Sequence, residues 1–187
     1  MTGFRVVDTT TRLHSGFLEV LEATVVGPGD EQFVRTIVRH PGAVTVVPVI
    51  GDAPDVLLVR QDRAAVGAPI LEAPAGKRDV DGEPPEETAR RELEEEVAHR
   101  AGRLEWLGEC FTSPGFCDEY AYLFAALDLT PLDETTAVTA EEAAMTVERV
   151  PLDSVDDLIA ARELVDATTI VGLLLTRELL GRSPSAS

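Results

Sequence analysis

The chain of 187 residues has few basic residues and no long apolar segment. Its 16 Lys and Arg residues stand against 34 Asp and Glu residues, which gives a formal net charge of −18 at pH 7. Because phosphate backbones are bound through Lys and Arg, this imbalance argues against nucleic acid or an anionic membrane as a partner. No apolar run reaches the roughly 18 residues that a membrane span needs, and the first residues lack a signal-peptide pattern.

Cysteine is also scarce, and the common catalytic signatures are missing. Cys110 and Cys117 form no CxxC pair and indicate no disulfide framework, so we expect a reducing, cytoplasmic compartment. His14, His40 and His99 have no zinc-ligand spacing with each other or with the cysteines. GxSxG, GxGxxG and P-loop motifs do not occur either, so nothing indicates a nucleophile elbow, a dinucleotide fold or a P-loop.

The remaining composition is that of a globular domain, with 44% hydrophobic and 27% charged residues. Residues 1–42 alternate β-prone segments with turns, which predicts two or three antiparallel strands. Residues 43–50 form a near-continuous apolar run, as is typical of a strand buried on both faces. Further strands are expected at 55–61, 69–74, 103–111, 120–129 and 147–152.

A helix is predicted after the acidic loop that ends near residue 83. Pro84 and Pro85 suit the first turn of a helix, where a missing N–H costs nothing. Ala89, Leu93 and Val97 recur at four-residue spacing and predict its buried stripe. Further helices are expected at 154–163 and 167–180. This order of strands, acidic helix, strands and terminal helix predicts an α+β or mixed α/β sandwich.

The stretch with the most chemical information runs from residue 72 to residue 99. Glu92 and Glu96 lie four residues apart, so on a helix they project from one face and repel each other. Hard cations with oxygen ligands would relieve this repulsion and would assist phosphate chemistry. Taken alone, the same pattern is typical of a solvated surface helix. Gly76 and Gly82 favour the ligand site, because they let the chain turn sharply and bring carbonyl groups toward the helix.

This loop and helix resemble the Nudix box, G-x5-E-x7-R-E-U-x-E-E-x-G-U, in which U is aliphatic. Gly76 opens the motif, Glu83 is its first glutamate, and residues 91–96 complete its acidic core. The chain departs from the motif in three places: six residues separate Gly76 from Glu83, Ala98 replaces a glycine, and His99 replaces an aliphatic residue. None of these departures removes an acid of the motif.

The resemblance extends over nearly the whole chain. The segments VRQDR (59–63), LEAPAGKRD (71–79), SPGFCDE (113–119) and AEEAAMT (140–146) occur in the order seen in ADP-ribose pyrophosphatases of this superfamily. The resemblance implies a Nudix-fold α/β/α sandwich with a mixed sheet over residues 43–182. It also implies an N-terminal antiparallel β extension over residues 1–42 that builds a homodimer. Residues 183–187 are expected to form a flexible tail.

By the same resemblance, Glu92 and Glu96 bind divalent metal ions, and the carbonyl group of Ala75 is a further ligand. Glu95 is implied as a ligand or as a support, and Arg91 as the residue that orients the acids through charge-assisted hydrogen bonds. Glu83 has a supporting role in the family as well. Mg²⁺, or Mn²⁺ in its place, would bridge the diphosphate, neutralise its charge and activate a water molecule.

A general base is expected in the acidic loop before the last strand. Glu142 is favoured and Glu141 is the alternative, although such a loop is also often only solvated. The candidates for substrate contacts are Arg60, Arg63, Glu72, Gly115, Phe116 and Glu119. The arginines would hold the diphosphate or the terminal ribose, the glutamates would contact ribose hydroxyls or adenine, and the Gly–Phe pair would shape a loop over the ligand. The structural alternatives are surface arginines, glutamates that flank a strand and a loop, and a core role for the phenylalanine.

The expected activity is Mg²⁺-dependent hydrolysis of the diphosphate of ADP-ribose to AMP and ribose 5-phosphate by a homodimer. The nearest alternative is the same chemistry on another nucleotide sugar or on a dinucleotide. A non-catalytic Nudix ligand sensor is a second alternative, which the three retained acids disfavour because a pure binder does not need them. A third is an acidic globular protein whose helix is only solvated.

Overall fold

The computed structural model describes residues 3–51, 54–133 and 143–181. The chain divides into two compact units. The first unit contains residues 1–42 and 110–121, and the second contains residues 43–109 and 122–187. The acidic helix belongs to the second unit.

The first unit contains a three-stranded antiparallel sheet in the order β1-β2-β3. Its strands are β1 (Arg5–Ser15), β2 (Leu18–Val26) and β3 (Gln32–Arg39). The antiparallel strands predicted before residue 43 are therefore confirmed. β1 runs beyond its apolar start through the threonines at 9–11, because β-branched residues suit a strand and each of them pairs with β2. The loop of residues 112–119 lies beside β3, where Val38 N–H donates to the carbonyl of Phe116 at 2.7 Å.

The second unit contains a seven-stranded sheet with the central order β10-β5-β4-β9-β8, in which β6 pairs with β5 and β7 pairs with β4. Its strands are β4 (Ala43–Ile50), β5 (Asp55–Arg63), β6 (Ala68–Glu72), β7 (Ala75–Lys77), β8 (His99–Phe111), β9 (Tyr120–Pro131) and β10 (Thr146–Pro151). The end of β8 and the start of β9 belong to the first unit.

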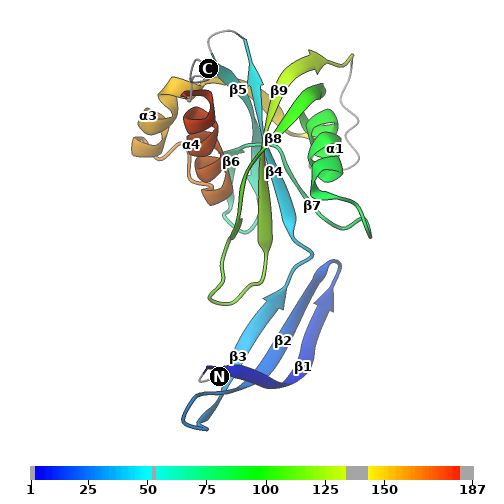
Figure 1. Cartoon of the computed structure of the whole chain (residues 1–187), viewed down its shortest axis with the longest axis vertical. Coiled ribbons are helices and arrows are strands. Elements are labelled where there is room, and N and C mark those ends of the chain that lie inside the picture. Colours follow the sequence, from blue (N-terminus) through cyan, green and yellow to red (C-terminus); the bar gives the residue numbers. More distant parts are fainter. Residues whose placement is uncertain (1–2, 52–53, 134–142, 182–187) are drawn as a thin grey trace, which may run out of the picture. The chain divides into compact units, whose positions relative to one another are not determined.

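Helices cover both faces of this sheet. They are α1 (Pro85–Val97), the 3₁₀ turn η1 (Leu152–Ser154), α3 (Val155–Ala160) and α4 (Ala167–Gly181). Figure 1 shows α1 on one side of the sheet and α3 and α4 on the other. Val44 and Val46 of β4 belong to the same apolar cluster as Leu93 of α1. Val47 belongs to the opposite cluster with Leu173 of α4. Burial on both faces explains the near-continuous apolar sequence of β4.

The ends of α1 follow from its sequence. Pro84 is the N-cap, and the predicted stripe of Ala89, Leu93 and Val97 is buried. The helix ends at Ala98, which has φ 52° and ψ 43° and donates its N–H to the carbonyl of Leu93. This left-handed conformation favours glycine, so Ala98 occupies a position where an L side chain is strained.

Several elements differ from the sequence-based expectation, and β8 begins at His99 rather than at residue 103. The strand expected over 69–74 is β6, which ends at Glu72. The short strand β7 follows it and was not predicted, because the chain changes partner from β5 to β4 around Pro74, which has no N–H to donate. The helix expected over 154–163 is shorter: it ends at Ala160, and Arg162 has a left-handed φ of 62°. In the part of the chain that the structure describes, no helix is long and apolar enough to cross a bilayer.

Candidate metal-binding and catalytic site

The candidate site lies where α1 meets the segment that joins β6 to β7. Glu92 and Glu96 of α1 are each only 8% exposed. Ala75 N–H donates to Glu96 Oε2 at 3.2 Å. Gly76 lies against Glu92, and a β-carbon added to Gly76 would overlap the Glu92 carboxylate. The structure therefore brings together three of the predicted metal ligands, namely Ala75, Glu92 and Glu96.

The environment of Glu96 is unfavourable for an uncompensated negative charge. Burial, together with the charge of Glu92, raises the pKa of Glu96 to about 8, although the hydrogen bond from Ala75 and the charge of Arg63 oppose the shift. A cation beside the two carboxylates would favour their ionised forms. Carboxylate and carbonyl oxygens are also the ligands that hard divalent cations prefer, so the residues present fit Mg²⁺.

Arg91 links the acids of the motif. Its Nη1 donates to Glu92 Oε1 at 2.6 Å and to Glu95 Oε2 at 3.2 Å, and its Nη2 donates to Glu83 Oε2 at 3.3 Å. Burial opposes the charge of Arg91, but the hydrogen bond to Glu83 and the charges of all three acids raise the pKa of Arg91 above its ordinary value. Thr88 Oγ1 donates a further hydrogen bond to Glu83 at 2.8 Å.

These ion pairs affect the way in which a metal ion could bind. Among residues 3–51, 54–133 and 143–181, no three acidic, histidine or cysteine side chains are already gathered as a metal-holding set. Glu92 and Glu95 instead share the guanidinium group of Arg91. Arg91 therefore restrains the orientation of both carboxylates.

Arg63 and Glu72, two predicted substrate contacts, form a bidentate ion pair next to this cluster. Arg63 Nε and Nη2 donate to the two carboxylate oxygens of Glu72 at 2.8 and 2.5 Å. The hydrogen bond to Glu72 raises the pKa of Arg63; burial opposes this, and the charges of Glu72, Glu96 and Asp166 add to it. Glu72 is buried, whereas the side chain of Arg63 is 42% exposed. Arg63 thus carries a partly accessible positive charge close to Glu96.

Arg60 also has an acidic partner, which the sequence analysis did not single out. Its Nε and Nη2 donate to the carboxylate of Glu148 on β10 at 2.5 and 3.2 Å. The hydrogen bond from Arg60 lowers the pKa of Glu148. Arg60 therefore joins β5 to β10 in this structure, and its contact with substrate stays a prediction.

The other predicted substrate contacts belong to the first unit. Gly115 and Phe116 lie in the loop beside β3. Phe116 is 58% exposed, so the alternative of a core role is wrong. Glu119 accepts a hydrogen bond from Thr112 Oγ1 at 2.6 Å and lies 3.7 Å from His40 Nε2. Their contact with substrate stays a prediction. The candidate bases Glu141 and Glu142, and the tail at 183–187, lie outside the described residues.

The contribution of α4 to this region was not predicted from the sequence. Asp166 precedes α4, and its Oδ2 accepts hydrogen bonds from Thr169 N–H at 2.7 Å and from Thr168 Oγ1 at 2.8 Å. Thr169 Oγ1 in turn accepts a hydrogen bond from Ala73 N–H at 2.9 Å. The sequence D-A-T-T before an apolar run is a helix N-cap signal that would have identified Asp166. No local pattern indicates the contact between Thr169 and Ala73.

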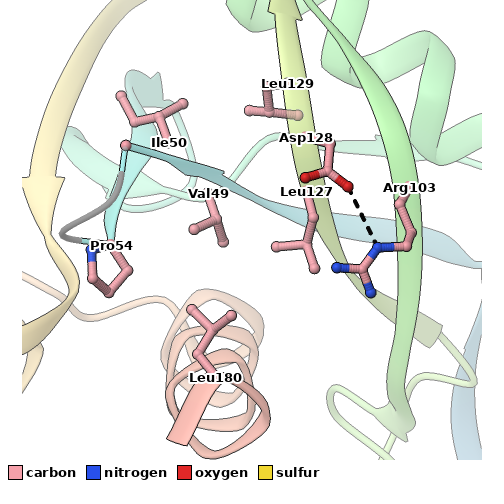
Figure 2. Close-up of a pocket in the computed structure, with 9 residues that line it drawn as sticks. Val49, Ile50, Pro54, Arg103, Leu127, Asp128, Leu129 and Leu180 are labelled. Atoms are coloured by element: carbon pink, nitrogen blue, oxygen red, sulfur yellow. Dashed lines mark hydrogen bonds and ion pairs between the residues drawn. The ribbon is translucent and has the colours of Figure 1, made fainter. Parts of the chain in front are cut away.

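A separate hollow of about 590 Å³ lies elsewhere in the second unit. Figure 2 shows apolar side chains around it, including Leu127 and Leu180, and an ion pair between Arg103 and Asp128 at 3.5 Å. Its lining includes no residue of α1 or of the segment between β6 and β7. The hollow is therefore separate from the acidic cluster.

The sheet between helices, with an acidic helix lying on a glycine-containing loop, defines a Nudix-type domain. The NUDIX domain family model matches residues 39–168, and the chain belongs to this family. A solved structure described as an ADP compounds hydrolase superposes with a TM-score of 0.83 at 24% identity, covering 98% of this chain and 97% of the other. This match confirms the predicted mixed α/β Nudix fold.

Several characterised proteins are similar in sequence. The chain is 40% identical over 142 residues to an ADP-ribose pyrophosphatase of Bacillus subtilis (strain 168), covering 76% of this chain and 75% of that protein. It is 36% identical over 172 residues to an ADP-ribose pyrophosphatase of Mycobacterium tuberculosis, covering 91% and 82%. It is also 34% identical over 165 residues to a methanol dehydrogenase activator of Bacillus methanolicus, covering 88% of each.

Proposed function

We propose that this Nudix protein hydrolyses the diphosphate of ADP-ribose to AMP and ribose 5-phosphate, with Mg²⁺ as the cofactor. The observation that carries the proposal is the placement of Glu92 and Glu96 against the loop at Ala75 and Gly76. It is supported by the identities of 40% and 36% to two ADP-ribose pyrophosphatases.

The acidic cluster suits this reaction. Glu92, Glu96 and the carbonyl group of Ala75 would hold the divalent cation, with Glu95 as a further ligand or as a support. A divalent cation held by these residues would supply positive charge to neutralise the diphosphate and would favour ionisation of a water molecule. Arg91 donates to Glu92 and Glu95 and so restrains their orientation. Glu96 would release its proton as the cation binds, because a metal ligand must be ionised.

Positive side chains near the cluster would bind the substrate. Arg63 lies close enough to Glu96 for their charges to interact, and part of its side chain is accessible. We propose that Arg63, held in orientation by Glu72, contacts the diphosphate. Arg60, Glu119 and the loop at 115–116 are further candidates for the ribose and the base.

The general base is proposed to be Glu142, with Glu141 as the alternative. Glu141→Gln and Glu142→Gln, made separately, test the two positions because each keeps the side-chain volume and removes the carboxylate. Loss of turnover is expected in only one of them. Unchanged rates in both variants would remove this loop from the chemistry.

The activity itself is tested with a substrate panel in Mg²⁺. ADP-ribose, other nucleotide sugars, NADH and diadenosine polyphosphates are compared, and the release of AMP is followed by chromatography. Preferred turnover of ADP-ribose, abolished by EDTA, is expected. Preference for another compound would keep the chemistry and change the substrate. If none of these compounds is hydrolysed, a non-catalytic ligand sensor is favoured instead.

We also propose that the protein is a homodimer assembled through the first unit and located in a reducing, cytoplasmic compartment. Every residue of β1 is exposed in the single chain, including Val6, Val7 and Leu13, and apolar residues exposed together in this way mark interfaces. The reducing compartment is proposed because both cysteines are free thiols. Light scattering should give the mass of a dimer for the wild type and of a monomer for the Val6→Asp/Leu13→Asp variant. Val147→Asp, at an exposed valine of β10, is the control that should stay dimeric.

A further inference from the structure

The segment that carries the carbonyl group of Ala75 is held from three sides. Ala73 N–H donates to Thr169 Oγ1 of α4 at 2.9 Å. The carbonyl of Pro74 accepts a hydrogen bond from a β4 N–H at 2.9 Å. Ala75 N–H donates to Glu96 of α1 at 3.2 Å. Three successive residues are therefore bonded to three different elements of the second unit, and the bond from α4 is the one made by a side chain from outside the sequence motif.

The hydroxyl of Thr169 is itself held in position. Thr169 is fully buried, and its N–H donates to the N-cap residue Asp166 at 2.7 Å. One turn further along α4, Gly172 packs closely on the sheet: a β-carbon there would stand 3.0 Å from Val47 Cγ2. The start of α4 is thus fixed by its own cap and by close packing on β4, and it presents the hydroxyl at a defined place.

We propose that Thr169 is a positioning residue of the metal site, an inference that rests on the proposed function. Ala73 is 1% exposed, so its N–H has no access to bulk water and depends on the Thr169 hydroxyl. Loss of this acceptor would release the peptide two residues before the proposed carbonyl ligand, and it would loosen the hydrogen bond between Ala75 and Glu96. Residues that orient metal ligands typically change metal affinity or activity by about 10–100-fold when they are removed.

The chain offers a matched set of variants for this inference. Thr169→Val keeps the shape and removes the acceptor, whereas Thr169→Ser retains the hydroxyl. Thr176 lies on the same helix and is also fully buried, and its Oγ1 has no hydrogen-bond partner among the described residues. Thr176→Val therefore removes a buried hydroxyl without removing a known hydrogen bond to the site, and it controls for the general effect of the substitution.

The readouts are Mg²⁺ binding to the metal-free protein by calorimetry, amide hydrogen exchange at Ala73 by NMR, and kcat and KM for ADP-ribose. Thr169→Val is expected to weaken Mg²⁺ binding by about 10–100-fold, to lower kcat and to accelerate exchange at Ala73. Thr169→Ser and Thr176→Val should both resemble the wild type. If Thr169→Val does not fold, Thr169→Cys replaces it, because a thiol is a weak acceptor of similar size.

Wild-type Mg²⁺ affinity and kcat in Thr169→Val, even with a lower melting temperature, would overturn the inference and leave Thr169 a purely structural residue. A wild type that binds Mg²⁺ without hydrolysing ADP-ribose would reject the proposed function alone, since Mg²⁺ binding and amide exchange would still decide the role of Thr169. A wild type that binds no Mg²⁺ would overturn both.

Discussion

Gly76 and Glu92 lie so close together that no side chain fits between them. A β-carbon on Gly76 would overlap Oε1, Oε2 and Cδ of the Glu92 carboxylate. The glycine that opens the sequence motif is therefore required for space, in addition to the sharp turn for which the sequence analysis selected it. A side chain here would displace a proposed metal ligand directly.

Gly76→Ala should lower kcat by at least about 10-fold with little change in melting temperature. The φ of Gly76 lies outside the left-handed region, so alanine can adopt the backbone, and the flexible Glu92 side chain is what must move. Steady-state kinetics and thermal melts check this. Gly181→Ala, at a glycine with open space around it, is the control. Wild-type turnover in Gly76→Ala would show that Glu92 can move without loss of function.

Glu96→Gln should abolish turnover and leave the fold intact, because it removes the charge of a proposed ligand and keeps the volume. Circular dichroism and turnover of ADP-ribose in Mg²⁺ provide the measurement. Glu94→Gln is the matched control on the same helix, since Glu94 pairs with Arg100 outside the cluster. Near-normal activity in Glu96→Gln would contradict the metal assignment.

The metal-free protein should lose stability as the pH rises toward 8. Burial and the charge of Glu92 raise the pKa of Glu96 from 4.5 to about 8 in the folded state, so the folded chain holds this proton more tightly than the unfolded chain does. The resulting stabilisation is complete below pH 4.5 and is lost as the pH rises through 8.

Urea unfolding in EDTA at a series of pH values, with wild type and Glu96→Gln side by side, measures this effect. The free energy of unfolding of the wild type should fall relative to that of the variant between the two pKa values. If the free energy of unfolding of the wild type and of the variant changes with pH in parallel, Glu96 does not have the raised pKa. Mg²⁺ should restore stability most strongly at the alkaline end, where binding displaces fewer protons.

Ala98→Gly should stabilise the protein by about 0.5–1 kcal/mol, because glycine relieves the left-handed backbone at the end of α1. Activity should not change, since Ala98 follows the last acid of the motif. Ala161→Gly is the opposite control: Ala161 caps α3 in a right-handed conformation, so glycine there should destabilise the protein. A loss of stability in Ala98→Gly would contradict the assignment of strain.

The sequence alone predicted those parts of the fold that depend on residues close together in the chain. Four-residue spacing predicts the buried stripe of α1, paired prolines predict its start, and an unbroken apolar run predicts that β4 is buried on both faces. The order of acids in the motif also predicts the placement of Glu92 and Glu96 on one face, because helix geometry fixes that relation.

The sequence by itself determined the class of fold and the acids of the candidate site, because helix periodicity and motif spacing act over a few residues. Only the tertiary structure decided which distant groups support that site. Thr169 reaches Ala73 across 96 positions of the chain, and Arg60 reaches Glu148 across 88. Such pairs form when a strand or a helix packs against the central sheet. Burial strengthens these hydrogen bonds, and burial arises only when the layers of the fold assemble.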